Sequence, residues 1–503
     1  MNSPEHLDVL IIGAGISGIS AGYHLQSMCP ERSWAILEAR SALGGTWDLF
    51  RYPGIRSDSD MHTFGFGFRP WPNAKAISEA DEILAYLKDT AREYRIDERI
   101  RYGHKLLAAD WSSKDACWTV RVQVTQAQDP AGKGKAGELA VQSTPIERIL
   151  RCNFLLMCSG YYDYDRGYLP DFPGAERFKG RLVHPQFWTP DIAWQGKRVV
   201  VIGSGATAVT LVPSMAREAA HVTMLQRSPT WILSRPAVDP IGRQLQRFLP
   251  AGLAHRLTKA KNLALGSWFY RMCRNNPERA GRGLLKMVRK QLPEGYDVQK
   301  HFTPRYNPWE QRLCLVPNGD LFKAIRSGKA EVVTDQIETF TETGIRLKSG
   351  QELQADLVVS ATGLELKFMG GIALSIDGQP VDPRESLPYK GLMLSGIPNL
   401  ALVFGYTNAS WTLRADLVNA FVGRLLQHMR SSNTAWVVAR PPGQAVPTAP
   451  WVDFSSGYFQ RALDRFPKQG EVAPWRTEQN YKRDVELLKN APLEDGVLQF
   501  GRP

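Results

Sequence analysis

Apolar runs that end in glycine-rich turns divide the chain into repeated strand–turn–helix units. In HLDVLIIGAGISGISAGYHLQ an apolar strand leads through glycines into a helix, and SWAILEA follows as a second strand. GKRVVVIGSGATAVTLVPSMA repeats this pattern, and HVTMLQRS supplies the strand after it. A strand, glycine turn, helix and second strand are typical of the βαβ unit of a dinucleotide-binding fold. We therefore expect an α/β protein with two Rossmann-like domains.

The remaining pattern adds strands and one helical segment. CWTVRVQV alternates between apolar and polar residues, and AEVVT, GIRLKS and ADLVVSATG also predict strands. Residues 240–300 show helical periodicity, with apolar side chains near one face at Leu245, Phe248, Leu249, Leu253 and Leu257. The length of 503 residues exceeds one ordinary hydrophobic core, so two or three domains are expected.

Composition excludes several classes of protein. No apolar run approaches the ~18 residues of a membrane span, and the start MNSPEHLDVLIIGAG lacks the basic region of a signal peptide. The six cysteines have neither paired nor zinc-binding spacing. We therefore expect a cytoplasmic protein with reduced thiols and no metal site.

The net charge of +12 is concentrated in one segment. Residues 243–300 contain 13 Lys and Arg against 3 Asp and Glu, so this segment carries +10. No nucleic-acid motif accompanies the charge, and we expect no nucleic-acid partner. Two interpretations stay open: solvated helix faces around a small core, or a surface that rests peripherally on the inner face of the cell membrane and admits lipophilic substrates.

The first glycine turn is Gly13-Ala14-Gly15-Ile16-Ser17-Gly18. It opens a helix whose N-terminus suits a pyrophosphate. Glu38 ends the next strand, 20 residues after Gly18. Its carboxylate can accept hydrogen bonds from a ribose diol and would repel a 2′-phosphate, so this turn predicts a site for FAD or NAD.

The second turn, Gly203-Ser204-Gly205-Ala206-Thr207-Ala208, precedes a strand that ends in Arg227 and Ser228 instead of an acid. A guanidinium and a hydroxyl suit the 2′-phosphate of NADP. Two sites of opposite preference imply electron transfer from NADPH to a bound flavin. Cys152 and Cys158 are the nearest cysteine pair, but they lie six residues apart in or beside an apolar strand. Dioxygen is therefore a better electron acceptor than a disulfide.

Two further motifs resemble a known family. Phe178-x-Gly180-x-x-x-His184-x-x-x-Trp188 resembles the fingerprint of the type I Baeyer–Villiger monooxygenases, which use FAD and NADPH to insert oxygen beside a carbonyl. The stretch from Gly44 to Asp58, GGTWDLFRYPGIRSD, matches the other pattern of the same family. The chain departs from the fingerprint at Thr189, where the family has Pro or Asp.

The resemblance implies a reaction. NADPH reduces FAD, reduced flavin and O2 form a C4a-peroxyflavin, and its anion attacks a small lipophilic ketone to give an ester or lactone; sulfides and thioamides are expected to be oxidised as well. Within enzymes, the alternatives are an N/S-oxygenating flavin-containing monooxygenase and an NADPH oxidase that releases peroxide. From another class, the alternative is a flavin- and NADP-binding sensor without turnover.

The resemblance also assigns catalytic residues. The family's arginine matches Arg312 in WEQRLCLVPNGD. At ~4 Å and an effective dielectric near 20, its attraction for a peroxide anion is roughly 4 kcal/mol. Asp58 matches the acid that pairs with this arginine and orients it, and Glu310 is an alternative partner. Gln311 stands where many relatives have a lysine that contacts the NADP phosphate, which leaves more of that recognition to the strand end at residues 227–228.

By resemblance, cofactor-lining residues come from both signatures. The FAD site is expected to include Ser17, Glu38, Gly45, Thr46, Trp47, Asp48, Leu49, Asp58 and Leu106. The NADP site is expected to include Arg56, Ser57, the 203–208 turn, Arg227 and Ser228. His184 and Trp188 are expected to lie on the link between the two domains and to help couple cofactor binding to domain motion.

These assignments predict a domain organisation. We expect an FAD-binding domain from residues 1–150 and 366–503, and an NADP-binding domain from residues 151–239 and 312–365. The helical insertion is expected over residues 240–311.

Overall fold

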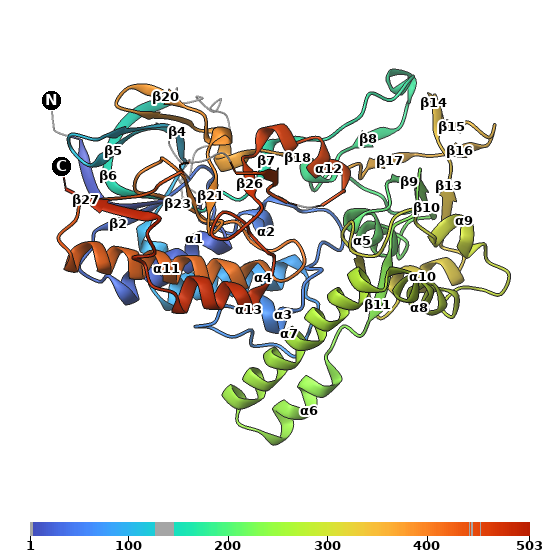
Figure 1. Ribbon diagram of the computed structural model, residues 1–503. Coiled ribbons are helices and arrows are strands. Elements are labelled where there is room, and N and C mark those ends of the chain that lie inside the picture. Colours follow the sequence, from blue (N-terminus) through green and yellow to red (C-terminus); the bar gives the residue numbers. More distant parts are fainter. Residues whose placement is uncertain (1–3, 126–144, 442, 444–445, 453, 503) are drawn as a thin grey trace, which may run out of the picture.

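The structure is a computed structural model that describes residues 4–125, 145–441, 443, 446–452 and 454–502. The polar stretch QAQDPAGKGKAGE, whose glycines and proline predict a loop, lies outside the described residues. Two α/β bodies lie side by side, and a helical hairpin projects from them (Figure 1). This arrangement confirms the α/β fold class with two Rossmann-like units and a helical segment.

The larger body is built on a nine-stranded sheet in the order β20-β19-β4-β5-β6-β1-β2-β3, with β23 also paired to β6. Strands β23, β6, β1, β2 and β3 are parallel, and β4, β5 and β6 form an antiparallel meander. Every residue of β2 is buried, as expected for a parallel strand covered on both faces. The strands are β1 (Glu5–Ile12), β2 (Trp34–Glu38), β3 (Ile100–Tyr102), β4 (His104–Ser112), β5 (Cys117–Val124), β6 (Ile146–Met157), β19 (Ala373–Ile376), β20 (Gln379–Val381) and β23 (Leu400–Leu402).

Helices cover this sheet and fix the first glycine turn. Helix α1 (Ile16–Met28) begins directly after the turn and packs along α11 (Trp411–Ser431) from the far end of the chain. Buried apolar side chains of both helices and of the sheet form one core. The other helices of this body are α2 (Thr46–Leu49), α3 (Met61–Phe64), α4 (Ala80–Glu93), α12 (Gly457–Gln460) and α13 (Tyr481–Asp484).

The smaller body is built on a five-stranded parallel sheet in the order β13-β10-β9-β17-β8. Helices α5 (Ala206–Met215) and α10 (Asp320–Arg326) pack beside it, and a three-stranded antiparallel sheet, β14-β15-β16, lies at one end. The strands are β8 (Arg181–Val183), β9 (Arg198–Ile202), β10 (His221–Gln226), β13 (Ala330–Thr334), β14 (Ile337–Thr341), β15 (Gly344–Leu347), β16 (Glu352–Gln354) and β17 (Leu357–Ser360).

Two chain segments connect the bodies and pair with each other. Strand β7 (Tyr162–Gly167) leads out of the larger body, and β18 (Leu364–Leu366) leads back; they form an antiparallel pair. Strand β6 lies wholly in the larger sheet as far as Met157, so the expected boundary at residue 150 divides a strand.

The segment after residue 239 is helical, as the periodicity predicts. It contains α6 (Pro240–Phe248), α7 (Ala251–Asn275), α8 (Pro277–Arg289) and α9 (Val298–Phe302), and it lies between the paired strands β11 (Ile232–Arg235) and β12 (Cys314–Pro317). Of the five apolar side chains near one face, three are exposed, Phe248 by 76%, Leu253 by 44% and Leu257 by 43%, whereas Leu245 and Leu249 are half-buried. The face of α7 that is buried instead carries Ala254, Thr258 and Asn262. Within the described residues, no helix is long and apolar enough to span a membrane.

Candidate functional site

The first glycine turn lies against the end of the neighbouring strand. Gly13 has φ of +103°, and a Cβ there would meet the carbonyl oxygen of Cys158 at 2.7 Å, so only glycine fits. The carboxylate of Glu38 is buried beside the turn, where it accepts hydrogen bonds from the backbone N–H groups of Ala14 (2.8 Å) and Arg40 (2.9 Å). Burial raises the pKa of Glu38, and the two backbone hydrogen bonds oppose that rise. The predicted ribose acceptor is therefore fixed next to the helix N-terminus.

The second turn repeats this geometry. Gly203 has φ of +136°, and a Cβ there would meet the carbonyl oxygen of Ala361 at 2.4 Å. Helix α5 begins directly after Gly205. The hydroxyl of Ser204 donates to the carbonyl of Ser228 at 2.9 Å, which ties the turn to the end of β10. The side chain of Arg227 is exposed beside it.

Both turns open into one cavity of about 1070 Å³ between the two bodies. This volume lies slightly above the roughly 300–1,000 Å³ that most small-molecule sites occupy. The wall includes these residues singled out from the sequence: Gly13, Gly15, Ser17, Glu38, Gly45, Thr46, Trp47, Arg56, Ser57, Asp58, Leu106, His184, Gly203, Ser204, Gly205, Ala206, Thr207, Arg227, Ser228 and Arg312.

The other residues singled out lie behind or away from the wall: Gly18, Asp48, Leu49, Phe178, Gly180, Trp188 and Ala208. Asp48 is buried and pairs with Arg40 at 2.7 Å and Arg51 at 2.5 Å. Gly18 packs so closely on the carbonyl of Gly13 that a Cβ would overlap it. These two residues shape the turn region without facing the cavity.

Arg312 and Asp58 form a two-fold hydrogen-bonded ion pair in the cavity wall. The Nε of Arg312 donates to Asp58 Oδ2 at 2.5 Å and its Nη2 donates to Oδ1 at 2.6 Å, although 254 residues separate the two. Nη1 also donates to the carbonyl of Thr407 at 3.1 Å. Burial disfavours the guanidinium cation, but Asp58 more than offsets this, and the pKa of Arg312 lies above its ordinary value. Glu310, the alternative partner, instead accepts hydrogen bonds from Asn307.

Aromatic side chains surround this pair. The ring of Tyr161 packs among Phe404, Trp411 and Phe459, and its hydroxyl lies 3.3 Å from that of Tyr162. Burial raises the pKa of Tyr161 well above its ordinary value, and it also raises that of Tyr162. Both phenols therefore stay protonated at neutral pH, and their rings supply an apolar wall beside the guanidinium.

Arg56 and Ser57 lie between the two bodies. The Nη1 of Arg56 donates to Asp320 Oδ2 at 2.6 Å, at the start of α10. Its Nη2 is buried and has no hydrogen-bond partner among the residues that the structure describes. Ser57 is buried, and its backbone N–H donates to the carbonyl of Ser78. Arg56, which is expected at the NADP site, thus connects the larger body to the smaller one.

The fingerprint segment, residues 178–188, joins the smaller body to both linkers, which are the chain segments of β7 and β18 that connect the two bodies. The Nε2 of His184 lies 2.9 Å from the carbonyl of Gly363, and its Nδ1 accepts from the backbone N–H of Gln186 at 3.2 Å. This pairing requires a neutral ring that donates through Nε2, and burial lowers the pKa of His184 accordingly. Trp188 is buried in the core of the smaller body, where it contacts Trp194 edge to face. His184 therefore ties the fingerprint segment to Gly363, directly before the linker strand β18.

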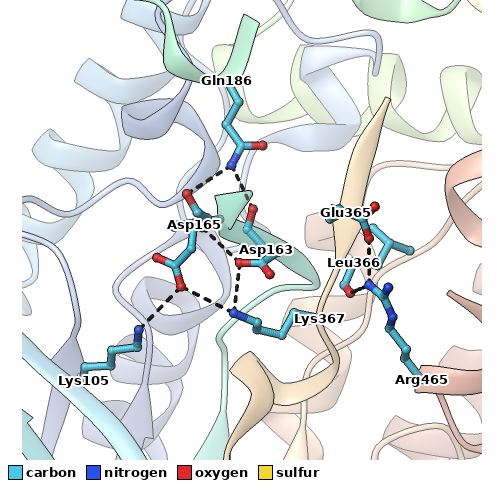
Figure 2. Close-up of polar contacts among 9 residues, drawn as sticks. Lys105, Asp163, Asp165, Gln186, Glu365, Leu366, Lys367 and Arg465 are labelled. Atoms are coloured by element: carbon cyan, nitrogen blue, oxygen red, sulfur yellow. Dashed lines mark hydrogen bonds and ion pairs between the residues drawn. The ribbon is translucent and has the colours of Figure 1, made fainter. Parts of the chain in front are cut away.

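A cluster of charged and amide groups braces the two linkers (Figure 2). The Nζ of Lys367 lies 2.9 Å from Asp163 Oδ1 and 3.4 Å from Asp165 Oδ2, while Lys105 reaches Asp165 from β4 at 3.6 Å. From the fingerprint segment, the amide of Gln186 donates to the carbonyls of Asp163 and Tyr164. The larger body, both linkers and the fingerprint segment are therefore connected in one network.

The described residues show neither a redox disulfide nor a cluster of metal ligands. All six cysteines are free and buried, including Cys152 and Cys158, so the part of the chain that the structure describes contains no disulfide. Burial raises the pKa of both thiols, which makes them poor nucleophiles. The same part of the chain contains no cluster of His, Cys, Asp and Glu that would hold a metal ion.

Sequence reasoning missed several of these residues. Tyr161 and Tyr162 come shortly after the carboxyl end of a parallel strand. Ligands bind at this edge of α/β sheets, so the position of the two tyrosines in the sequence could have identified them as cavity residues. Gln186 lies at an unspecified position of the fingerprint, and Lys367 directly follows a linker; neither carries a local signal. Tyr458 reaches the cavity from the C-terminal region, and only tertiary structure places it there.

Comparisons with known proteins agree with this geometry. A model of flavin-binding monooxygenase-like proteins matches residues 117–370, and one of NAD(P)-binding Rossmann-like domains matches residues 11–79. The chain is 54% identical to the FAD-containing monooxygenase EthA of Mycobacterium tuberculosis, over 99% of this chain and 98% of that protein. It is 47% identical to a protein described as probable FAD-binding monooxygenase AlmA of Acinetobacter baylyi, over 99% of this chain and 97% of that one.

Solved structures share the fold at lower identity. An oxidised steroid monooxygenase bound to NADP superposes with a TM-score of 0.77 at 21% identity, covering 99% of this chain and all of that one. An open structure of cyclohexanone monooxygenase gives 0.71 at 18% identity, with 99% of each chain covered. With the full-length identity above, these matches confirm the resemblance found in the sequence: the chain belongs to the family of flavin-binding monooxygenases.

Proposed function

We propose that this protein is an FAD- and NADPH-dependent monooxygenase of the Baeyer–Villiger type. It inserts one atom of O2 beside the carbonyl of a small lipophilic ketone to give an ester or lactone, and it also oxidises sulfides and thioamides. The observation that carries the proposal is the Arg312–Asp58 pair in the wall of a cavity that both glycine turns share. Neither nucleotide site alone requires a fixed cation at that place.

The residues present fit FAD at the first turn. The close contact of Gly13 with Cys158 leaves a backbone cradle at the start of α1, and the buried Glu38 carboxylate stands beside it to accept from a ribose diol. Trp47 and Leu106 add apolar wall on the same side of the cavity. When bound there, the flavin supplies the electrons and the activation of O2.

The second turn fits NADPH. The exposed guanidinium of Arg227 and the hydroxyl of Ser228 directly follow β10 at the cavity, where an acid would reject a 2′-phosphate. Gln311 also lines the cavity, in place of the lysine of many relatives. The 2′-phosphate is therefore held mainly by residues 227 and 228. In this assignment the larger body binds FAD, the smaller body binds NADPH, and the paired strands β7 and β18 lie at the boundary between them.

Arg312 holds a permanent positive charge where the oxygen-transfer step develops negative charge. Asp58 fixes the plane of the guanidinium by two hydrogen bonds, and the carbonyl of Thr407 holds Nη1. A fixed cation in a site of low dielectric stabilises an oxyanion without reorganisation. Tyr161 and Trp411 exclude water from this side of the cavity, which protects the step against release of hydrogen peroxide.

The test is incubation of the FAD-loaded protein with NADPH, O2 and phenylacetone, followed by product analysis. The proposal expects benzyl acetate, water and NADP+ in equal amounts. Hydrogen peroxide without ester would show an NADPH oxidase, and oxidation of a sulfide or amine without any ester would show an N/S-oxygenating enzyme. Absence of NADPH consumption would show a binding protein without turnover. Each of these three results would refute the proposal.

A further inference from the structure

The α6–α7 hairpin exposes large apolar side chains that no other described part of the chain covers. Of the eleven most exposed large hydrophobic residues that the structure describes, six fall between residues 241 and 268. Phe248 at the end of α6 is 76% exposed and Trp268 on α7 is 58% exposed. Figure 1 shows α6 and the adjoining part of α7 standing away from both bodies. A concentrated apolar surface of this kind marks an interaction site.

The orientation of the hairpin is fixed by small and polar contacts. Ala254, Thr258 and Asn262 form the buried face of α7, and the amide of Asn262 donates to Asp60 Oδ2 at 2.9 Å. Lys261 pairs with Asp239, the N-cap residue of α6, at 2.5 Å. Asn262 and the small side chains hold α7 against the larger body, and Lys261 holds it to the start of α6. The bulky apolar side chains therefore point outward in the folded protein and are not displaced core residues.

The charge of the hairpin selects the partner. Residues 240–275 contain seven Lys and Arg and no Asp or Glu. Arg243, Arg247, Arg256 and Arg271 are exposed, and among the residues described none of the four pairs with an acidic side chain. The guanidinium of Arg247 lies over the ring of Phe248, 5.7 Å from its centroid. Two copies of this surface would repel each other, whereas a surface of anionic phosphates would attract it.

We propose that the α6–α7 hairpin docks this protein on an anionic lipid bilayer. Phe248 and Trp268 insert at the level of the headgroups, where aromatic side chains are favoured, and the arginines contact lipid phosphates. Apolar insertion and electrostatic attraction together supply the two signals that peripheral anchoring needs. This contact goes beyond the proposed reaction and does not depend on it.

Vesicle sedimentation of the FAD-loaded, full-length protein tests the proposal. We expect binding to vesicles of phosphatidylglycerol and phosphatidylcholine, weaker binding to phosphatidylcholine alone, and release at high salt. The variant F248S/W268S should bind the anionic vesicles at least about tenfold more weakly, since burial of two large apolar side chains is lost. The variant R243Q/R247Q/R256Q should also lose at least about tenfold, since each basic residue contributes roughly fivefold near an anionic surface.

A matched control removes exposed apolar residues elsewhere. The variant L169S/V472S changes two side chains that are 52% and 60% exposed outside the hairpin, and it should bind vesicles as the unmodified protein does. The flavin absorption spectrum and the melting temperature of each variant establish that it is folded. Equal vesicle binding by F248S/W268S and the control, or no binding by the unmodified protein, would overturn the proposal. So would an oligomer that F248S/W268S dissociates, since the surface would then contact a second copy.

Discussion

Replacement of Asp58 by Asn tests the role of the Arg312–Asp58 pair. The carboxylate accepts hydrogen bonds from Nε and Nη2 of Arg312 at 2.5 and 2.6 Å. An asparagine keeps one acceptor, places an amide donor against a guanidinium donor and removes the charge. A hydrogen bond to a charged group contributes about 1.5–3 kcal/mol. Solvent reaches 30% of the Arg312 side chain and 29% of Asp58, so the two hydrogen bonds together are worth less than twice this value. We therefore expect the loss of guanidinium orientation to raise the barrier to ester formation by about 2–3 kcal/mol.

That loss corresponds to a decrease of about 30- to 150-fold in the rate of ester formation. The assay combines ester quantification with stopped-flow measurement of flavin reduction by NADPH, and we expect the reduction rate to change little. Arg312→Ala should also retain flavin reduction and form no ester. Glu310→Gln is the matched control, because Glu310 pairs with Asn307, and its ester formation should stay within about threefold.

A double-mutant cycle separates positioning from a direct role. If Asp58 acts through Arg312, Asp58→Asn should slow residual turnover by less than about threefold when Arg312 is already alanine. Residual turnover is followed as oxidation of a sulfide, so that a signal remains in both backgrounds. Additive effects, or undiminished ester formation by Asp58→Asn alone, would refute the reasoning.

Three further predictions address other parts of the molecule. Arg227→Ala should raise the KM for NADPH about 10- to 100-fold and that for NADH much less, since only NADPH has the 2′-phosphate; equal changes would contradict the assignment. Lys367→Met removes the partner of the buried Asp163, so steady-state assays should show more NADPH lost to hydrogen peroxide, whereas Lys179→Met in an exposed pair should behave as the unmodified enzyme. Burial lowers the pKa of His255 to about 4, so the folded state binds fewer protons than the unfolded state between pH 6.5 and 4, and stability falls as pH falls through this window. His255→Gln should weaken that fall by about 1–2 kcal/mol, measured by thermal melting between pH 7 and 5; an unchanged pH dependence would contradict the assignment.

Local signals in the sequence predict the two nucleotide-binding turns. Gly13 and Gly203 each lie between an apolar strand and a helix, and the close backbone contacts of both require glycine. Glu38 is predictable for the same reason, because its distance from the turn along the chain is set by one helix and one strand. The pairing of Arg312 with Asp58 has no local signal, since 254 residues separate them. Only the resemblance to a family predicts it.

The remaining features depend on tertiary packing. Lys367 and Gln186 both bind Asp163 because β7 and β18 pair, and no spacing in the sequence predicts these two contacts. The periodicity of α6 and α7 predicts helices correctly but gives the wrong buried face for α7. The face that packs carries Ala254 and Thr258, because small side chains allow the close approach of α3, while the leucines stay outside.

The central claim is that one atom of O2 enters the product beside the carbonyl while the other leaves as water. The direct measurement is turnover of phenylacetone by the FAD-loaded protein with NADPH under ¹⁸O2, followed by mass spectrometry of the ester. We predict benzyl acetate with a single ¹⁸O in the ester linkage, one molecule for each NADPH oxidised. Unlabelled ester, or NADPH oxidation that yields only hydrogen peroxide in the presence of the ketone, would contradict this prediction.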